Sequence, residues 1–262
     1  MKLVSLNIEF NTHTDVVLDF LRKEDPDVIC FQELLEEDFE FYKKEFGGNA
    51  VFRVCRYESR SAHPHIIGKK QGVGIFSKNI VDAGSMFYVG DEGETSRPFD
   101  QNSLNNTQAL VWADIKNEDG EVYRFVTVHM PVTKHGESTP FQIEALDSLF
   151  SKIEPLGEFI LCGDMNAPRG RETFKRLAER FKDNIPLEYK TSIDQNLHRV
   201  KGLQLMVDGL FTTSTYKAMN VKLVDGVSDH MAIVAEISKD HLSMSMARAG
   251  EPSMSVNLSG KQ

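Results

Sequence analysis

The chain has 262 residues, of which 40% are hydrophobic, and its formal net charge is -9. This length is enough for one large hydrophobic core, so we expect a single domain. The negative charge excludes a protein that coats polyanions through an overall basic surface, but it leaves open a phosphate substrate held by a metal ion.

Several other protein classes are disfavoured. No apolar run approaches the roughly 20 residues of a membrane-spanning helix, so we expect no membrane span. The three cysteines are an odd number, and two of them lie in apolar, strand-like runs, which argues against a disulfide framework. Because residues 1–8 already read as a core strand, we expect no signal peptide. A cytoplasmic monomer is the default expectation.

Hydrophobic periodicity predicts strands and helices at both ends of the chain and a β-rich middle. The first helix stops before Pro26, and Gly47 and Gly48 end an acidic second helix. Thr139 opens a third helix with a capping box. In chain order the sequence predicts strand 2–8, helix 14–24, strand 27–33, helix 35–46, strands 51–57, 71–78, 80–90, 107–115 and 121–130, helix 140–154, strand 158–163, helix 171–183, a polar loop at 184–200, and strands 203–213, 218–224 and 229–237.

Helices before and after a mostly β middle predict an α/β fold, a four-layer α/β/β/α sandwich of two packed, mostly antiparallel sheets. This domain is expected to occupy residues 1–238. Residues 239–262 are rich in Ser, Met and Lys and show no periodicity. We therefore expect a polar, loosely ordered tail after the domain.

Polar residues stand at the ends of six of the apolar runs, and a strand that ends in a polar group is a common way for a sheet to build an active site. Each has an ordinary structural explanation when taken alone, such as a turn closed by an aspartate side chain. A cluster of carboxylates without a function is unfavourable, because like charges repel. The set therefore predicts one metal-dependent phosphoester site. Its members are Asn7, Glu33, His129, Asp164 with Asn166, Asp208, and Asp229 with His230.

The order of these motifs resembles the endonuclease/exonuclease/phosphatase superfamily, which has the DNase-like fold. Asn in a first strand is followed by Gln-Glu, His-x-Pro, Gly-Asp-x-Asn, Asp-Gly-Leu-Phe and Ser-Asp-His, over residues 1 to about 237. The resemblance implies a hydrolase of phosphate esters that uses Mg²⁺, with Mn²⁺ as a substitute.

Hydrolysis of a phosphodiester needs positive charge near the phosphate oxygens and removal of a proton from the attacking water. Glu33 is the main candidate for a metal ligand, because Mg²⁺ takes one or two protein carboxylates and keeps water or substrate oxygens for the rest. By resemblance Asn7, Asp164 and Asp229 also belong to the metal site. Glu9 would add a carboxylate to its outer shell.

The remaining roles concern catalysis and phosphate binding. Asp208 would hold His230 in one tautomer, as the carboxylate does in an Asp-His pair. Either Asp164 or His230 would take the proton from water, and the sequence leaves both open. By resemblance the catalytic residues are His129, Asp164, Asn166, Asp208 and His230, and those that bind the substrate phosphate are Asn7, His129, Asn166 and His230.

Substrate choice rests on weaker signals. The segment 53–70 carries five basic residues against Glu58 alone, and it either tracks a nucleic-acid backbone or is a solvated loop. A second basic group lies at the start of the helix after the Gly-Asp-x-Asn motif. These residues would either bind phosphate or simply lie on the surface of the helix. The two groups are Arg53, Arg56, Arg60, Lys69 and Lys70, and Arg169, Arg171, Lys175 and Arg176.

Other residues have default interpretations. Trp112 lies in mid-strand and is expected in the core. The stretch before Asp208 lacks the Trp-rich text of abasic-site endonucleases, and His129 stands where those enzymes commonly have tyrosine, so abasic-site repair is disfavoured. The histidines expected to be surface or loop residues are His13, His63, His65, His135 and His198.

The leading prediction is therefore a metal-dependent hydrolase that cleaves a phosphodiester, with a nuclease as the first substrate class. One alternative is a phosphodiesterase or phosphatase for a small or lipid-linked phosphate, of the sphingomyelinase or inositol-phosphatase kind. Another is a non-catalytic module that holds a phosphate or a protein partner. The intact set of polar residues favours an enzyme.

Overall fold

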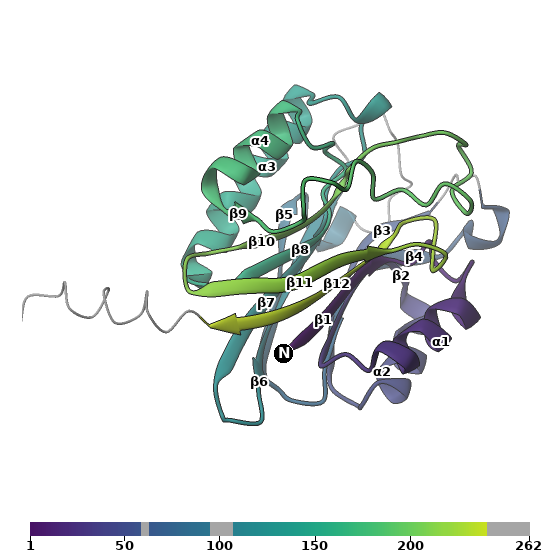
Figure 1. The fold of residues 1–262 in the computed structure, drawn as a ribbon. Coiled ribbons are helices and arrows are strands. Elements are labelled where there is room, and N and C mark those ends of the chain that lie inside the picture. The colour runs from purple at the N-terminus through teal and green to yellow at the C-terminus, as the bar shows by residue number, and fades with distance from the viewer. Residues whose placement is uncertain (59–62, 95–106, 240–262) are drawn as a thin grey trace, which may run out of the picture.

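The computed structural model describes residues 1–58, 63–94 and 107–239. Two six-stranded sheets pack face to face, and helices cover the outer surface of each (Figure 1). This confirms the predicted four-layer α/β/β/α sandwich. Apart from Lys239, the predicted tail lies outside the described residues.

The first sheet has the strand order β11-β12-β1-β2-β4-β3, and the second has the order β5-β6-β7-β8-β10-β9. Each sheet contains one parallel pair, β1 with β2 and β7 with β8, and its other pairs are antiparallel. The first sheet consists of β1 (Lys2–Asn7), β2 (Val28–Leu35), β3 (Ala50–Tyr57), β4 (Lys70–Phe76), β11 (Tyr216–Val224) and β12 (Ala232–Lys239). The second consists of β5 (Ile80–Val89), β6 (Gln108–Lys116), β7 (Val122–His129), β8 (Ile160–Asp164), β9 (Lys182–Asp183) and β10 (Asp208–Thr212).

The helices cover the two outer faces. Val17 and Leu21 of α1 (Thr14–Glu24) and Tyr42 of α2 (Phe39–Glu45) pack on the outer face of the first sheet. On the second sheet, Leu146 of α3 (Pro140–Ile153) and Leu177 of α4 (Glu172–Arg180) do the same. Their apolar positions recur at helical spacing, so each helix buries one side against its sheet.

The layer between the sheets changes from apolar to polar along the strands. Leu3, Phe125 and Ile160 form part of its apolar core. Further along, Gln32 Nε2 donates to Thr127 Oγ1 across the layer at 2.9 Å. Because side chains two residues apart share a face of a strand, the next positions on these rows also point between the sheets. Those positions are the predicted site residues Asn7, His129 and Asp164.

Several element boundaries differ from the prediction, mainly near the site. β2 continues to Leu35 through a bulge between Phe31 and Leu34, so the second helix begins later, after a 3₁₀ turn. The strand expected at 203–213 is regular only from Asp208, and the one expected at 229–237 is regular only from Ala232. In both places the chain bonds to other segments of the site, described below.

All three cysteines are buried and free. Trp112 lies at the margin of the core, half-buried, with the Arg124 guanidinium 5.1 Å from its ring centre. In the described part of the chain, no helix is long and apolar enough to cross a membrane.

Gly163 should be one of the least replaceable residues of the sheet. Its φ is 139°, and a Cβ built there would lie 2.1 Å from the Val128 carbonyl oxygen on the neighbouring strand. Gly163→Ala is therefore expected to lower the free energy of unfolding by about 2–3 kcal/mol, measured in urea. Gly157→Ala is the matched control, because Gly157 has φ 72° and open space around its Cβ site. It should cost only about 1 kcal/mol, and equal losses would contradict this account.

Candidate active site

Three predicted catalytic residues form a row across three adjacent strands of the second sheet. His129 lies opposite Asp164 in the β7-β8 pair, and Asp164 lies opposite Asp208 in the β8-β10 pair. All three are buried. Because residues directly opposite each other project from the same face of a sheet, their side chains emerge together at one end of the inter-sheet layer.

The first sheet brings its own polar residues to the same point. Asn7 Nδ2 donates to Asp164 Oδ2 at 3.2 Å. His129 Nε2 lies 3.5 Å from Asp164 Oδ2 and 3.8 Å from Glu33 Oε1. His230, two residues before β12, has its Nε2 3.9 Å from Asp164 Oδ2. Asp164 is therefore the point where groups from both sheets converge.

Asp208 and His230 form a buried pair, with Oδ2 and Nδ1 2.8 Å apart. Burial alone would lower the pKa of His230, but Asp208 and Asp164 outweigh it and raise that pKa well above its ordinary value. Burial also opposes ionisation of Asp164. The nearby His230 and His129 and the Asn166 amide outweigh it and lower the pKa of Asp164 to about 2. These shifts favour the ionised form of Asp164 and the protonated form of His230.

Asn166 shapes the turn after β8. Its amide N–H donates to Asp164 Oδ1 at 2.8 Å, and its φ of 46° is left-handed. Its side-chain Nδ2 donates to the Met130 carbonyl at 3.0 Å, and Gln142 Nε2 donates to the Asn166 carbonyl at 2.9 Å. Asn166 therefore fixes Asp164 through the backbone, while its side-chain donor binds the loop after β7.

A group of carboxyls lies beside this row. Burial, together with the charges of Glu33, Glu9 and Asp164, raises the pKa of Asp229 to about 7 against the opposing effect of His230. Burial also raises the pKa of Glu9 to about 7, with a contribution from Glu33. Several acids crowded in a partly buried site lower their repulsion when a cation binds among them, so the residues fit a divalent cation.

The most compact ligand set in the described ranges is Asp164, Asp208 and His230, whose ligand atoms all lie within 4.8 Å of one another. It shares only Asp164 with the metal residues predicted from the sequence. Glu33 and Asp229 adjoin it through the charge interactions described above. The predicted metal and catalytic residues therefore occupy one continuous site rather than two separate ones.

The basic residues of segment 53–70 are mostly paired with acids. Arg53 lies 3.5 Å from Glu92 and stacks on Phe87, Lys69 lies 2.6 Å from Glu37, and Lys70 lies 3.9 Å from Glu36. Arg56 is bonded to Glu58 at 2.9 Å and also reaches Glu33 at 4.0 Å. Arg60 lies outside the described residues. Of the predicted basic group, Arg56 is the member that contacts a site residue.

The second basic group also has internal partners. Arg169 Nη2 lies 2.7 Å from Asp183 Oδ2 and donates to the Ile185 carbonyl at 2.8 Å, which ties the loop after β9 to the site turn. Arg171 donates to the His135 carbonyl. The other two members pair with acids of α4, Arg176 with Glu172 at 3.1 Å and Lys175 with Glu179 at 3.7 Å. This group supports the fold.

Three histidines that were predicted to be surface or loop residues lie in loops and also contact site carboxylates. His13 Nε2 lies 2.8 Å from Glu9 Oε2, and His63 Nε2 lies 3.1 Å from Glu9 Oε1. His198 Nε2 lies 4.0 Å from Asp229 Oδ2. His65 and His135 are exposed, as expected.

The predicted polar loop also supplies a clamp that sequence reasoning missed. Ser192 Oγ accepts the Asp208 amide at 3.0 Å, and the Ser192 carbonyl accepts the Met231 amide at 2.7 Å. Ile193 forms a β-bridge with His230. These bonds fix the backbone on either side of the Asp208–His230 pair, and they explain why β10 and β12 begin late.

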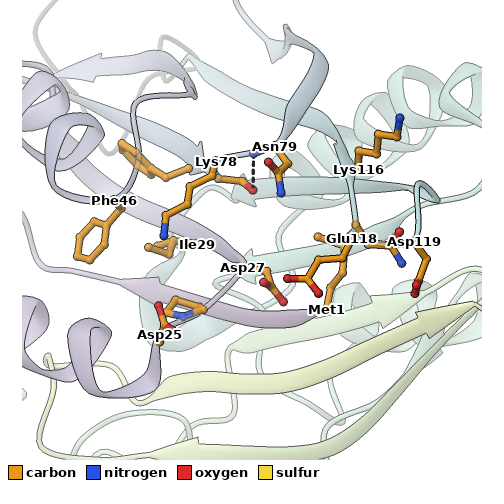
Figure 2. A pocket seen from close by; sticks show the side chains of 14 residues that line it. Met1, Asp25, Asp27, Ile29, Phe46, Lys78, Asn79, Lys116, Glu118 and Asp119 are labelled. Carbon is orange, nitrogen blue, oxygen red and sulfur yellow. Dashed lines mark hydrogen bonds between the residues drawn. The ribbon is translucent and has the colours of Figure 1, made fainter.

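A cavity of about 570 Å³ opens at the other end of the sandwich, where β1 and β2 begin and the β6-β7 hairpin turns (Figure 2). Carboxylates and lysines line part of it, together with the apolar Ile29 and Phe46. The predicted site residues do not line this cavity, because β1, β7 and β8 carry them at the opposite strand ends.

The raised pKa of Glu9 predicts how stability changes with pH in EDTA. A carboxyl pKa raised from 4.5 to about 7 contributes stability that is present below pH 4.5 and is lost as the pH rises through about 7. Glu9→Gln removes this loss, so the variant should gain stability over the wild type between pH 5 and pH 8 in urea unfolding. Glu118→Gln, an exposed and remote change, is the control. Parallel pH profiles for Glu9→Gln and the wild type would refute the prediction.

Comparison with known proteins identifies the family of the chain. The sequence profile of the Endonuclease/Exonuclease/phosphatase family matches residues 4–230. No curated protein matches the chain significantly.

Several solved structures share the fold. A functionally unknown conserved protein from Enterococcus faecalis V583 has a TM-score of 0.70 and 15% identity, covering 92% of this chain and 100% of that one. A mannosyl-6-phosphatase from Bacteroides thetaiotaomicron VPI-5482 has a TM-score of 0.66 and 14% identity, covering 91% and 99%. The human Nocturnin catalytic domain with a bound sulfate anion has a TM-score of 0.66 and 13% identity, covering 92% and 93%.

At these identities the structural matches show the fold alone. The family profile, however, covers most of the chain, from residue 4 to residue 230. The chain belongs to the endonuclease/exonuclease/phosphatase family of phosphoesterases.

Proposed function

We propose that the protein is a divalent-metal-dependent phosphoesterase that hydrolyses a phosphodiester by in-line attack of water. The observation that carries this proposal is the convergence on Asp164 of Asn7, His129 and His230, which come from both sheets. Such a site offers acceptors for a cation and for water next to donors for an anionic phosphate.

The acidic residues would hold the cation. Glu33, Asp164 and Asp229 would supply carboxylate oxygens, which Mg²⁺ and Mn²⁺ both accept. A bound cation neutralises phosphate charge and lowers the pKa of a coordinated water.

The chain's own residues then divide the remaining work. Ionised Asp164 orients the attacking water and accepts its proton. Protonated His230, held by Asp208 at 2.8 Å, donates to a non-bridging phosphate oxygen. His129, 3.5 Å from Asp164, is placed to donate to a second oxygen. Asn7 is a neutral donor and so can approach an anion without repelling it.

A nuclease is the first substrate class that we propose. Arg199 would bind a second phosphate of such a substrate, because it is exposed near the site. Its positive charge acts to lower the pKa values of Glu9, His63 and His198. A small phosphate ester is the second class. The internal pairing of the described basic residues in segment 53–70 and the net charge of -9 favour it.

Activity assays with variants test the chemistry. Asp164→Asn and His230→Gln are each expected to lower kcat by about 100- to 10,000-fold, because each removes a group that acts on the proton or the phosphate. His135→Ala, an exposed histidine, is the control and should retain wild-type kcat. The assay uses Mn²⁺ or Mg²⁺ with bis-p-nitrophenyl phosphate. Turnover that survives both site substitutions would overturn the proposal.

A substrate panel separates the two classes. It contains single-stranded DNA, RNA, sphingomyelin, inositol phosphates and sugar phosphates, all at one ionic strength. A nuclease should show its highest kcat/KM on a nucleic acid, and that value should fall steeply with salt because binding releases counterions. Highest kcat/KM on a small phosphate, with little salt dependence, would reject the nuclease.

A further inference from the structure

Glu9 occupies an unusual backbone segment. It follows β1 with φ 48°, and Phe10 follows with φ 63°, so two consecutive non-glycine residues are left-handed. Residues with side chains seldom adopt this conformation, and it persists only where surrounding contacts hold it. The turn closes with the Thr12 amide donating to the Glu9 carbonyl at 3.2 Å. The backbone is therefore locally strained at Glu9 and Phe10.

His13 adds a second irregularity. It is the N-cap residue of α1, where Ser, Thr, Asp or Asn would normally accept a backbone N–H of the first turn. Its side chain makes no capping bond. Instead Nε2 lies 2.8 Å from Glu9 Oε2. The helix therefore forgoes a stabilising cap while this imidazole holds Glu9.

The other oxygen of Glu9 is held from a distant segment. His63 Nε2 lies 3.1 Å from Glu9 Oε1, and the His63 ring packs against Phe10 with 5.8 Å between ring centres. Both contacts join the turn at 9–12 to His63, the residue just before the 3₁₀ turn Pro64–Ile66. Each carboxylate oxygen of Glu9 thus has its own imidazole, and the side chain has one preferred orientation.

Glu9 contacts the rest of the site through both its backbone and its side chain. Its amide donates to Asn7 Oδ1 at 3.1 Å, which leaves Asn7 Nδ2 directed at Asp164. Its carboxyl interacts with Glu33 and Asp229, two of the proposed metal residues. The Glu9 carboxyl therefore affects the charge of the cation site even if it does not bind the cation itself.

We propose that His13 and His63 are positioning residues that fix both oxygens of Glu9 and thereby set the affinity of the site for its divalent cation. This inference rests on the proposed function. Loss of an outer-shell partner typically lowers metal affinity by about 10- to 100-fold, because the carboxylate must then be ordered when the cation binds.

Direct binding of Mn²⁺, followed by electron paramagnetic resonance of the free ion, tests the proposal. His13→Ala and His63→Ala should each raise the Kd for Mn²⁺ by about 10-fold or more. His13→Gln and His63→Gln keep a donor near Nε2 and should retain most of the affinity. His135→Ala is the control, because His135 is an exposed histidine of another segment, and it should bind Mn²⁺ as the wild type does. Thermal melts identify any variant that fails to fold.

A double-mutant cycle separates positioning from general stability. In the Glu9→Gln background, His13→Ala and His63→Ala should cause little further loss of Mn²⁺ affinity, because their effect acts through Glu9. Alanine variants that bind Mn²⁺ like the wild type, or that lose the same affinity in both backgrounds, would overturn the inference alone. A wild-type protein that takes up no Mn²⁺ would overturn the proposed function as well.

Discussion

The hydrogen bond from Asn7 Nδ2 to Asp164 Oδ2, 3.2 Å long, joins the two sheets at the polar end of the layer between them. The geometry of the site depends on it and on the register of the strands behind it. His129, Asp164 and Asp208 are aligned because β7, β8 and β10 pair without an irregularity there. A shift of one residue in any of these strands would turn its polar end residue to the opposite face. The apolar rows that include Leu3, Phe125 and Ile160 oppose such a shift, since it would expose the core.

The fold and the centre of the site could be predicted because their signals are local. An apolar run with period two identifies a strand and its faces, and a polar residue at its end shows where the layer meets solvent. Repeated over six segments, this pattern predicts that Asn7, Asp164 and His230 lie together. The alternation of β-rich and helical stretches likewise indicated two sheets with helices outside.

The surroundings of the site could not be predicted, because they depend on contacts between distant segments. His63 meets Glu9 across more than fifty residues of sequence, and Ser192 bonds to both Asp208 and Met231. The basic residues show the same limitation. The sequence shows that Arg169 is charged, but it does not show that its guanidinium pairs with Asp183 and donates to a loop carbonyl. One local signal was present: His13 stands where helix α1 would normally have a capping side chain.

In the proposed function, both sheets supply the residues around one cation. A crystal grown with Mn²⁺, with diffraction data collected near the manganese absorption edge, would locate that cation. We expect an anomalous peak beside Asp164, between Glu33 of the first sheet and the row His129–Asp208 of the second. Ordered Mn²⁺ found only elsewhere, such as among the carboxylates of the cavity at the opposite end of the sandwich, would contradict it.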